Sequence, residues 1–150
     1  MKKITGITLL SFALLLTAFS IVKPPSSENN VDKEGIAFFK GSYKEALAKA
    51  KKENKLVFFD AYAVWCKPCL MMKKHSFTDP DVAAFFNKNF INVMMDMEKG
   101  EGIALSEQMD IGFYPTLLFL DGDGNIKQKK VGYLDGAALL SFGRSVKGAN

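Results

Sequence analysis

Both cysteines of this 150-residue chain, Cys66 and Cys69, lie in the stretch "WCKPC". Such a pair could form a structural disulfide, bind a metal or exchange electrons. A disulfide across two intervening residues closes a very small loop, so it restricts the unfolded chain little and stabilises weakly. A zinc site needs about four ligands, and the chain adds one histidine, His75, and no third cysteine. No metal site is therefore expected, and the spacing favours redox exchange.

The segments on either side of the pair would position it for that chemistry. Residues 56–63, "LVFFDAYA", form a continuous apolar run typical of a strand buried on both faces, and a helix is expected from about Lys67. Cys66 would then stand at a helix N-terminus, where unpaired N–H groups favour a thiolate. We predict Cys66 as the nucleophile and Cys69, one turn further on, as the thiol that resolves the mixed disulfide. Lys67 adds a nearby cation, and Pro68 stiffens the first helical turn.

Two further residues beside the pair have more than one interpretation. Trp65 would shield the site and offer an apolar face to a substrate, and half-buried packing is compatible with that role. Asp60 interrupts the apolar strand, either as a buried carboxylate or as an acid at an exposed strand end. The surrounding "LVFF" favours burial, which would raise the pKa of this carboxyl and suit acid–base work.

The remaining segments alternate between strand and helix patterns. A capping box at Ser42 and Glu45 begins a helix that should end near Asn54, and Thr78 or Asp79 should cap another helix. Strands are predicted at residues 36–40, 56–63, 90–97, 114–120 and 126–131, and further helices at residues 67–77, 102–109 and 135–146. The order β-α-β-α-β-α-β-β-α predicts an α/β fold: a central mixed sheet with helices on both faces and an antiparallel hairpin at one edge.

The first 34 residues differ in composition from the rest. Residues 1–20 place two lysines before an uncharged apolar run, which predicts a signal peptide or an uncleaved anchor. Residues 21–34 are rich in Pro, Ser, Asn and charge, which predicts a disordered linker, and residues 35–150 form the expected domain. The protein would thus be periplasmic or otherwise extracytoplasmic, either secreted through this segment or anchored to the membrane by it.

The charge balance argues against one class of partner. The formal net charge is +4, and it falls to +2 when Lys2 and Lys3 are removed with residues 1–20, which contain no acid. A balance so close to neutrality gives no support to nucleic-acid binding. A single domain of this size, with 48% hydrophobic residues, can bury a sizeable core without cysteine crosslinks.

Two motifs together point to a known family. "FFDAYAVWCKPC" and "YPTLLFLDGDGN" resemble the thioredoxin superfamily over residues 36–147, and "WCKPC…HSFTDPDV" is most similar to the soluble C-terminal domain of the bacterial membrane thiol:disulfide interchange reductase. The resemblance implies a thioredoxin-like fold and a thiol:disulfide oxidoreductase. It implies no cofactor other than the redox-active Cys66–Cys69 disulfide.

The resemblance also assigns roles to individual residues. Pro115, in "YPT", matches the family's cis-proline, which would face Cys66 and leave the backbone of Tyr114 free to pair with an extended substrate. Asp60 matches the buried acid that accepts a proton from Cys69. Asn92 is expected where cytosolic thioredoxins carry a lysine beside that acid. Trp65, Lys67, Pro68, Tyr114 and Pro115 are the expected substrate-binding residues.

The preferred hypothesis is an extracytoplasmic enzyme that reduces protein disulfides, because Pro68 as the second intervening residue resembles the reducing members of the family. Its partners would be disulfide-containing proteins and an upstream, membrane-bound thiol donor, with the chain itself a monomer. Two alternatives remain open. The thiolates and the methionines of "LMM" and "VMMDM" could carry Cu(I), or the domain could bind unfolded chains without catalysis. Substrate, electron donor and direction of transfer are not encoded in any motif.

Overall fold

A computed structural model describes residues 35–147 of the chain. The predicted signal segment, residues 1–20, and the predicted linker, residues 21–34, lie outside the described residues, as do the last three residues of the predicted domain. Among the residues that the structure describes, no helix is both long and apolar enough to cross a membrane.

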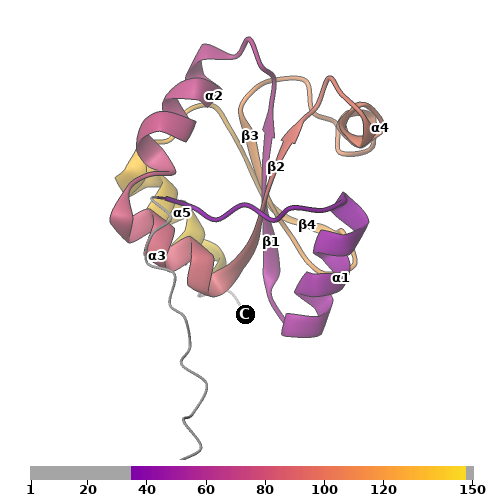
Figure 1. The fold of residues 1–150 in the computed structure, drawn as a ribbon, viewed down its shortest axis with the longest axis horizontal. Coiled ribbons are helices and arrows are strands. Elements are labelled where there is room, and N and C mark those ends of the chain that lie inside the picture. Colours follow the sequence, from indigo (N-terminus) through magenta and orange to yellow (C-terminus); the bar gives the residue numbers. More distant parts are fainter. Residues whose placement is uncertain (1–34, 148–150) are drawn as a thin grey trace, which may run out of the picture.

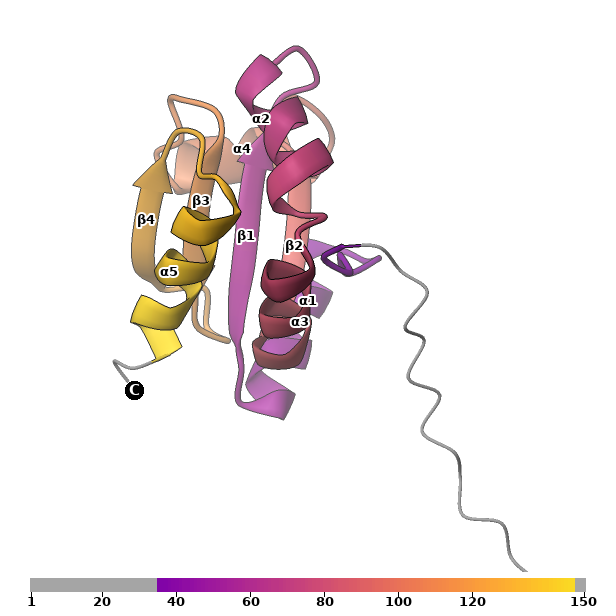
Figure 2. The same cartoon turned by 90° about the vertical axis from the view of Figure 1, so that its left-hand side faces the viewer.

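A four-stranded mixed sheet forms the centre of the domain, in the spatial order β2-β1-β3-β4 (Figure 2). Its strands are β1 (Leu56–Tyr62), β2 (Phe90–Asp96), β3 (Thr116–Leu120) and β4 (Ile126–Val131). β1 pairs in parallel with β2 and antiparallel with β3, and β4 closes one edge as the hairpin partner of β3. The five inner residues of β1 are all buried, as the apolar run predicts for a central strand.

Helices cover both faces of the sheet, which confirms the predicted α/β architecture (Figure 1). One face carries α1 (Tyr43–Glu53) and α4 (Glu101–Gln108), over a core that includes Val57, Phe59 and Leu118. The other carries α2 (Lys67–Met71), the π-helix η1 (Met72–Ser76), α3 (Pro80–Asn89) and α5 (Gly136–Lys147), over a largely aromatic core. β1 therefore contributes side chains to both cores.

The helix ends follow the predicted capping residues. The Ser42 hydroxyl accepts a hydrogen bond from the Glu45 N–H, and the Glu45 carboxylate accepts from the Ser42 N–H at 2.8 Å, which completes the capping box. Asn54 is the C-cap of α1 and adopts the left-handed conformation with φ of 50°. Asp79 caps α3, and Pro80 occupies its first turn, where a missing N–H costs nothing.

The predicted first strand, residues 36–40, is wrong. This segment makes only an isolated bridge, between Phe38 and Asn92. Its other amides have partners outside any ladder: the Ile36 N–H donates to the Phe77 carbonyl at 2.7 Å, and the Ala37 N–H donates to the side chain of Asn87 at 2.8 Å. Because those bonds hold the segment across α3 and β2, it cannot run along β2 as a strand.

Candidate active site

Cys66 and Cys69 form a disulfide where the chain leaves β1 and enters α2. The Cα atoms lie 5.3 Å apart, and both residues are buried. Cys66 is the N-cap of α2, and its sulfur accepts a hydrogen bond from the Cys69 N–H at 3.2 Å. The helix thus begins at Lys67, as predicted, and the Cys69 N–H of its first turn faces the Cys66 sulfur.

The helix that carries the cysteines changes its winding soon after them. Residues 67–77 were expected to be one helix, and the α-helical part ends at Met71, where η1 takes over. The Phe77 N–H donates to the Met72 carbonyl at 2.8 Å, the five-residue spacing of a π-helix. The Ser76 hydroxyl donates to the Leu134 carbonyl at 2.6 Å, which fixes this turn to the segment before α5.

Tyr114 and Pro115 lie beside the disulfide, and the peptide bond between them is cis, as the resemblance implies. The Tyr114 side chain packs against the small cluster of Ala63, Cys66 and Cys69. The Pro115 carbonyl accepts from the Gly132 N–H at 2.8 Å. Within residues 35–147, neither the backbone N–H nor the carbonyl of Tyr114 makes a hydrogen bond to another backbone group.

Trp65 stands on the surface next to Cys66. Its side chain is 65% exposed, so the interpretation as half-buried packing is wrong. The indole N–H donates to the Glu98 carboxylate at 2.9 and 3.0 Å, and the ring packs edge-on against Tyr114 with centroids 5.9 Å apart. Sequence reasoning missed Glu98, which lies in the β2–α4 loop, 33 positions after Trp65. No local pattern indicates a contact between residues so far apart in the chain.

Asp60 is buried in the middle of the sheet, as the flanking apolar residues predict, with 2% of its surface exposed. Burial raises the pKa of this carboxyl from 3.8 to about 7. Its Oδ1 atom has no hydrogen-bond partner in the part of the chain that the structure describes. A hollow of about 160 Å³ adjoins the carboxyl and is also lined by Cys69. An acid and the second cysteine thus share one small cavity.

On β2, Asn92 lies two residues from the register partner of Asp60. In the parallel register, Asp60 pairs with Met94, whereas Asn92 pairs with Phe58. The Asn92 amide group instead donates to the Asn87 side chain at 3.2 Å and to the Ala37 carbonyl at 3.5 Å. Both Asn92 and Met94 lie on the same face of β2, because they are two residues apart on one strand. β2 therefore places an uncharged thioether beside the acid.

An apolar rim surrounds the cysteines at the surface. It consists of five exposed residues next to the disulfide in the chain or next to Tyr114: Val64, Trp65, Leu70, Met71 and Phe113. Phe113 is 73% exposed, the largest value among them. Lys67 and Pro68 are exposed as well, in the first turn of α2. Sequence reasoning did not place Leu70 or Phe113 at this surface, although Phe113 directly precedes the "YPT" motif, and it considered Met71 only as a ligand in the Cu(I) alternative.

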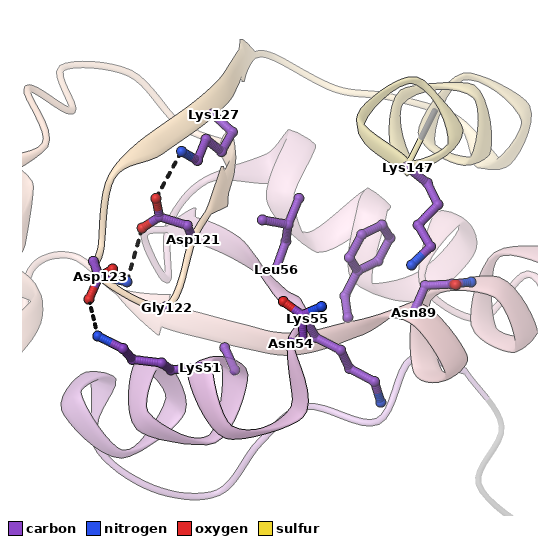
Figure 3. A pocket seen from close by; sticks show the side chains of 12 residues that line it. Lys51, Asn54, Lys55, Leu56, Asn89, Asp121, Gly122, Asp123, Lys127 and Lys147 are labelled. Atoms are coloured by element: carbon purple, nitrogen blue, oxygen red, sulfur yellow. Dashed lines mark hydrogen bonds and ion pairs between the residues drawn. The ribbon is translucent and has the colours of Figure 1, made fainter. Parts of the chain in front are cut away.

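A larger hollow, about 470 Å³, lies at the opposite end of the sheet, where β1 and β2 begin (Figure 3). Two of its lysines already have acidic partners: Lys51 contacts Asp123 at 2.6 Å, and Lys127 contacts Asp121 at 2.8 Å. These pairs tie α1 and β4 to the turn after β3, so we attribute this surface to structure. Among residues 35–147, no three His, Cys, Asp or Glu side chains are grouped to hold a metal ion.

The fold and the Cys66–Cys69 site define a thioredoxin-like thiol:disulfide oxidoreductase. Residues 32–109, more than half of the chain, match the family Thioredox_DsbH, described as a protein of unknown function, DUF255. The chain belongs to this family.

Solved structures and curated proteins agree with that assignment. A candidate disulphide isomerase from Bacteroides thetaiotaomicron is 44% identical, with a TM-score of 0.65 over 72% of this chain and 89% of its own. The oxidised C-terminal domain of Neisseria meningitidis DsbD is 23% identical, with a TM-score of 0.60 over 73% of this chain and 98% of its own, and shows the fold alone. The thiol:disulfide interchange protein DsbD of Colwellia psychrerythraea is 29% identical over 81% of this chain and 22% of its own length. The chain thus spans about a fifth of the curated relatives it matches.

Proposed function

We propose that this protein is an extracytoplasmic enzyme that reduces protein disulfides, with Cys66 as nucleophile and Cys69 as resolving thiol. The observation that carries the proposal is the Cys66–Cys69 disulfide at the N-terminus of α2, with the buried Asp60 beside Cys69. Its curated relatives are named thiol:disulfide interchange proteins, which supports the same class of reaction.

The reaction starts from the dithiol form. The Cys66 thiolate attacks one sulfur of a substrate disulfide, so a Cys66–substrate bond forms and the substrate's own S–S bond breaks. The departing substrate sulfur takes up a proton from water. The N–H groups in the first turn of α2 favour the Cys66 thiolate because they face its negative charge.

Cys69 then resolves the mixed disulfide. Its thiol transfers a proton to the Asp60 carboxylate, and the resulting thiolate attacks the Cys66 sulfur. The Cys66–Cys69 bond forms, and the second substrate sulfur leaves and is protonated. Two electrons have passed to the substrate, and a dithiol donor must reduce the disulfide before the next cycle. A carboxyl with a pKa of about 7 can both take and return this proton near neutral pH.

The substrate would lie across the surface between Trp65 and Tyr114. The backbone of Tyr114, which has no partner of its own among residues 35–147, would pair with an extended substrate segment next to Pro115. Trp65 and Phe113 would contact apolar side chains of that segment, and Lys67 and Pro68 would face it from α2. The partners are therefore proteins with exposed disulfides, together with an upstream thiol donor at the membrane.

A trapping experiment tests the roles of the two cysteines. The Cys69→Ser variant, incubated with a peptide that carries one disulfide, should accumulate a covalent adduct of protein and peptide, detected by intact mass spectrometry. The Cys66→Ser variant should form none under the same conditions, because Cys66, and not Cys69, is the N-cap of α2, where N–H groups favour a thiolate. An adduct formed by the Cys66→Ser variant alone, through Cys69, or by neither variant would contradict the proposal.

The direction of transfer needs a separate measurement, the equilibrium reduction potential of the Cys66–Cys69 pair. Thioredoxin lies near −270 mV and the oxidant DsbA near −120 mV. A value close to the first supports a reductase, and one close to the second would replace it by an oxidase. The location is tested by fractionating cells and sequencing the N-terminus of the mature protein, which should begin after Ser20.

A further inference from the structure

The hollow beside Asp60 is lined by one basic side chain. Its lining consists of Asp60, Tyr62, Val64, Cys69, Leu70, Lys73 and Met94. Lys73 belongs to η1 and lies four residues beyond Cys69, about one helical turn, so both side chains fall on one side of the helix. Lys73 is exposed, and in the described part of the chain it forms no ion pair.

Among the described residues, no hydrogen bond or ion pair offsets a negative charge on the Asp60 carboxylate in this hollow. Asp60 Oδ1 is buried without a hydrogen-bond partner among residues 35–147. The strands on either side offer only uncharged neighbours, since Asp60 pairs with Met94 on β2 and with Leu117 on β3. Ionising a buried carboxyl in such surroundings is costly unless a cation or a donor approaches it.

We propose that Lys73 is a positioning residue whose ammonium group, at the mouth of the hollow, stabilises the Asp60 carboxylate whenever that carboxylate is formed. The lysine stem can lie along the apolar lining of Val64 and Leu70 while its head group stays in water, as long cationic side chains commonly do. The inference deepens the proposed function, on which it rests, because Asp60 must be ionised before it can accept the proton of Cys69.

The other titratable groups that face Asp60 do not supply this charge. Tyr62 on β1 and Cys69 on α2 are neutral or negative when they titrate, so each would oppose ionisation of the acid. From β2 and β3, the paired residues Met94 and Leu117 do not titrate. Within the described residues, Lys73 of η1 is therefore the cation of this hollow.

The test is a titration of the Asp60 carboxyl by carbon-13 NMR in the oxidised protein, where neither cysteine can titrate. We expect Lys73→Met to move the midpoint upward by at least about 0.5 pH units, a fraction of the 1 to 3 units seen for close ion pairs. Lys73→Glu should move it further, and Lys73→Arg should restore it. Lys74→Met, the matched control, removes an equally exposed charge that does not line the hollow.

The outcomes separate this inference from the function it rests on. Equal midpoints in the wild type, Lys73→Met and Lys73→Glu would overturn the role of Lys73, as would an equal shift in Lys74→Met. The titration needs no turnover, so it stays informative even if the enzyme reduces no disulfide. In a single-turnover reduction of the same peptide by the protein that keeps both cysteines, the pH profile of the resolution step should move upward with Lys73→Met, and a profile that does not move would also contradict the inference.

Discussion

The indole N–H of Trp65 donates to both carboxylate oxygens of Glu98, at 3.0 and 2.9 Å, and this contact joins the residue before Cys66 to the loop between β2 and α4. Trp65 also packs against Tyr114. Three separate parts of the chain thus meet at the edge of the disulfide, and the orientation of the exposed indole depends on a residue outside the "WCKPC" motif.

Replacing Glu98 should loosen Trp65 without unfolding the protein. In Glu98→Ala we expect lower steady-state fluorescence anisotropy of Trp65, the chain's single tryptophan, because the indole loses its hydrogen-bond acceptor. The free energy of unfolding should change by less than about 1 kcal/mol, since the contact is at the surface. Glu98→Gln keeps an acceptor and should retain the anisotropy. Equal values in all three proteins would show that Glu98 does not orient the ring.

Asp60 should make the oxidised protein less stable as the pH rises from 4 to 7. The unfolded chain loses this proton near pH 3.8, whereas the folded protein keeps it up to about pH 7. Between these values the folded state binds more protons, so the free energy of unfolding falls as the pH rises. Linkage at about 1.4 kcal/mol per pKa unit predicts a loss of about 4 kcal/mol.

Asp60→Asn should remove this decline. The expected result is a free energy of unfolding, measured by urea titration at several pH values, that stays nearly level from pH 4 to 7. Asp121, whose pKa is lowered chiefly by the Lys127 ammonium group, contributes stability that is lost only at more acidic pH, so it does not confound the window. A parallel decline in the wild type and the variant would argue against a neutral, buried Asp60.

Phe113 should matter for protein substrates and little for folding. In Phe113→Ser we expect KM for a protein disulfide to rise about tenfold, typical of losing an aromatic anchor at an interface, with kcat largely kept. Reduction of a small disulfide such as oxidised glutathione should be unaffected. Ile126→Ser removes an exposed apolar residue at the start of β4, near the opposite end of the sheet, and serves as the control. An equal rise in KM in the control would remove Phe113 from the substrate surface.

Gly102 allows α4 to approach β2 closely. A Cβ atom at this position would contact the Asp96 carbonyl oxygen and lie 2.9 Å from the Met97 Cα, and neither backbone atom can move aside easily. We expect Gly102→Ala to lower the free energy of unfolding by about 1 to 3 kcal/mol, as overpacking does. Gly112→Ala, where a Cβ would meet nothing within 4 Å, should be close to neutral in the same denaturation experiment.

Local sequence patterns predict much of this fold. The apolar run of β1, the capping residues of α1 and α3, and the start of α2 at Lys67 depend on neighbours in the chain. The burial of Asp60 follows from its flanking residues for the same reason. These features place the disulfide at the end of a buried strand and the start of a helix before any long-range contact is known.

Several features that were missed or wrong depend on long-range contacts. The strand register that pairs Asp60 with Met94 is one feature that the apolar pattern leaves undetermined. Residues 36–40 read as a strand, but their amides are taken by Phe77, Asn87 and Asn92. The change to a π-helix at Met72 has no local signal either.

The central position of β1 also has a consequence for hydrogen exchange. Phe58, Phe59, Asp60 and Ala61 are buried and pair with strands on both sides, so their amide protons should exchange with solvent only when the whole domain opens. β4 is mostly exposed and pairs with β3 alone, so its amides should exchange through smaller local openings. Asp60 and the strand that leads to Cys66 therefore belong to the most slowly exchanging part of the protein. Disulfide exchange at Cys66, beyond the end of that strand, needs no opening of the sheet.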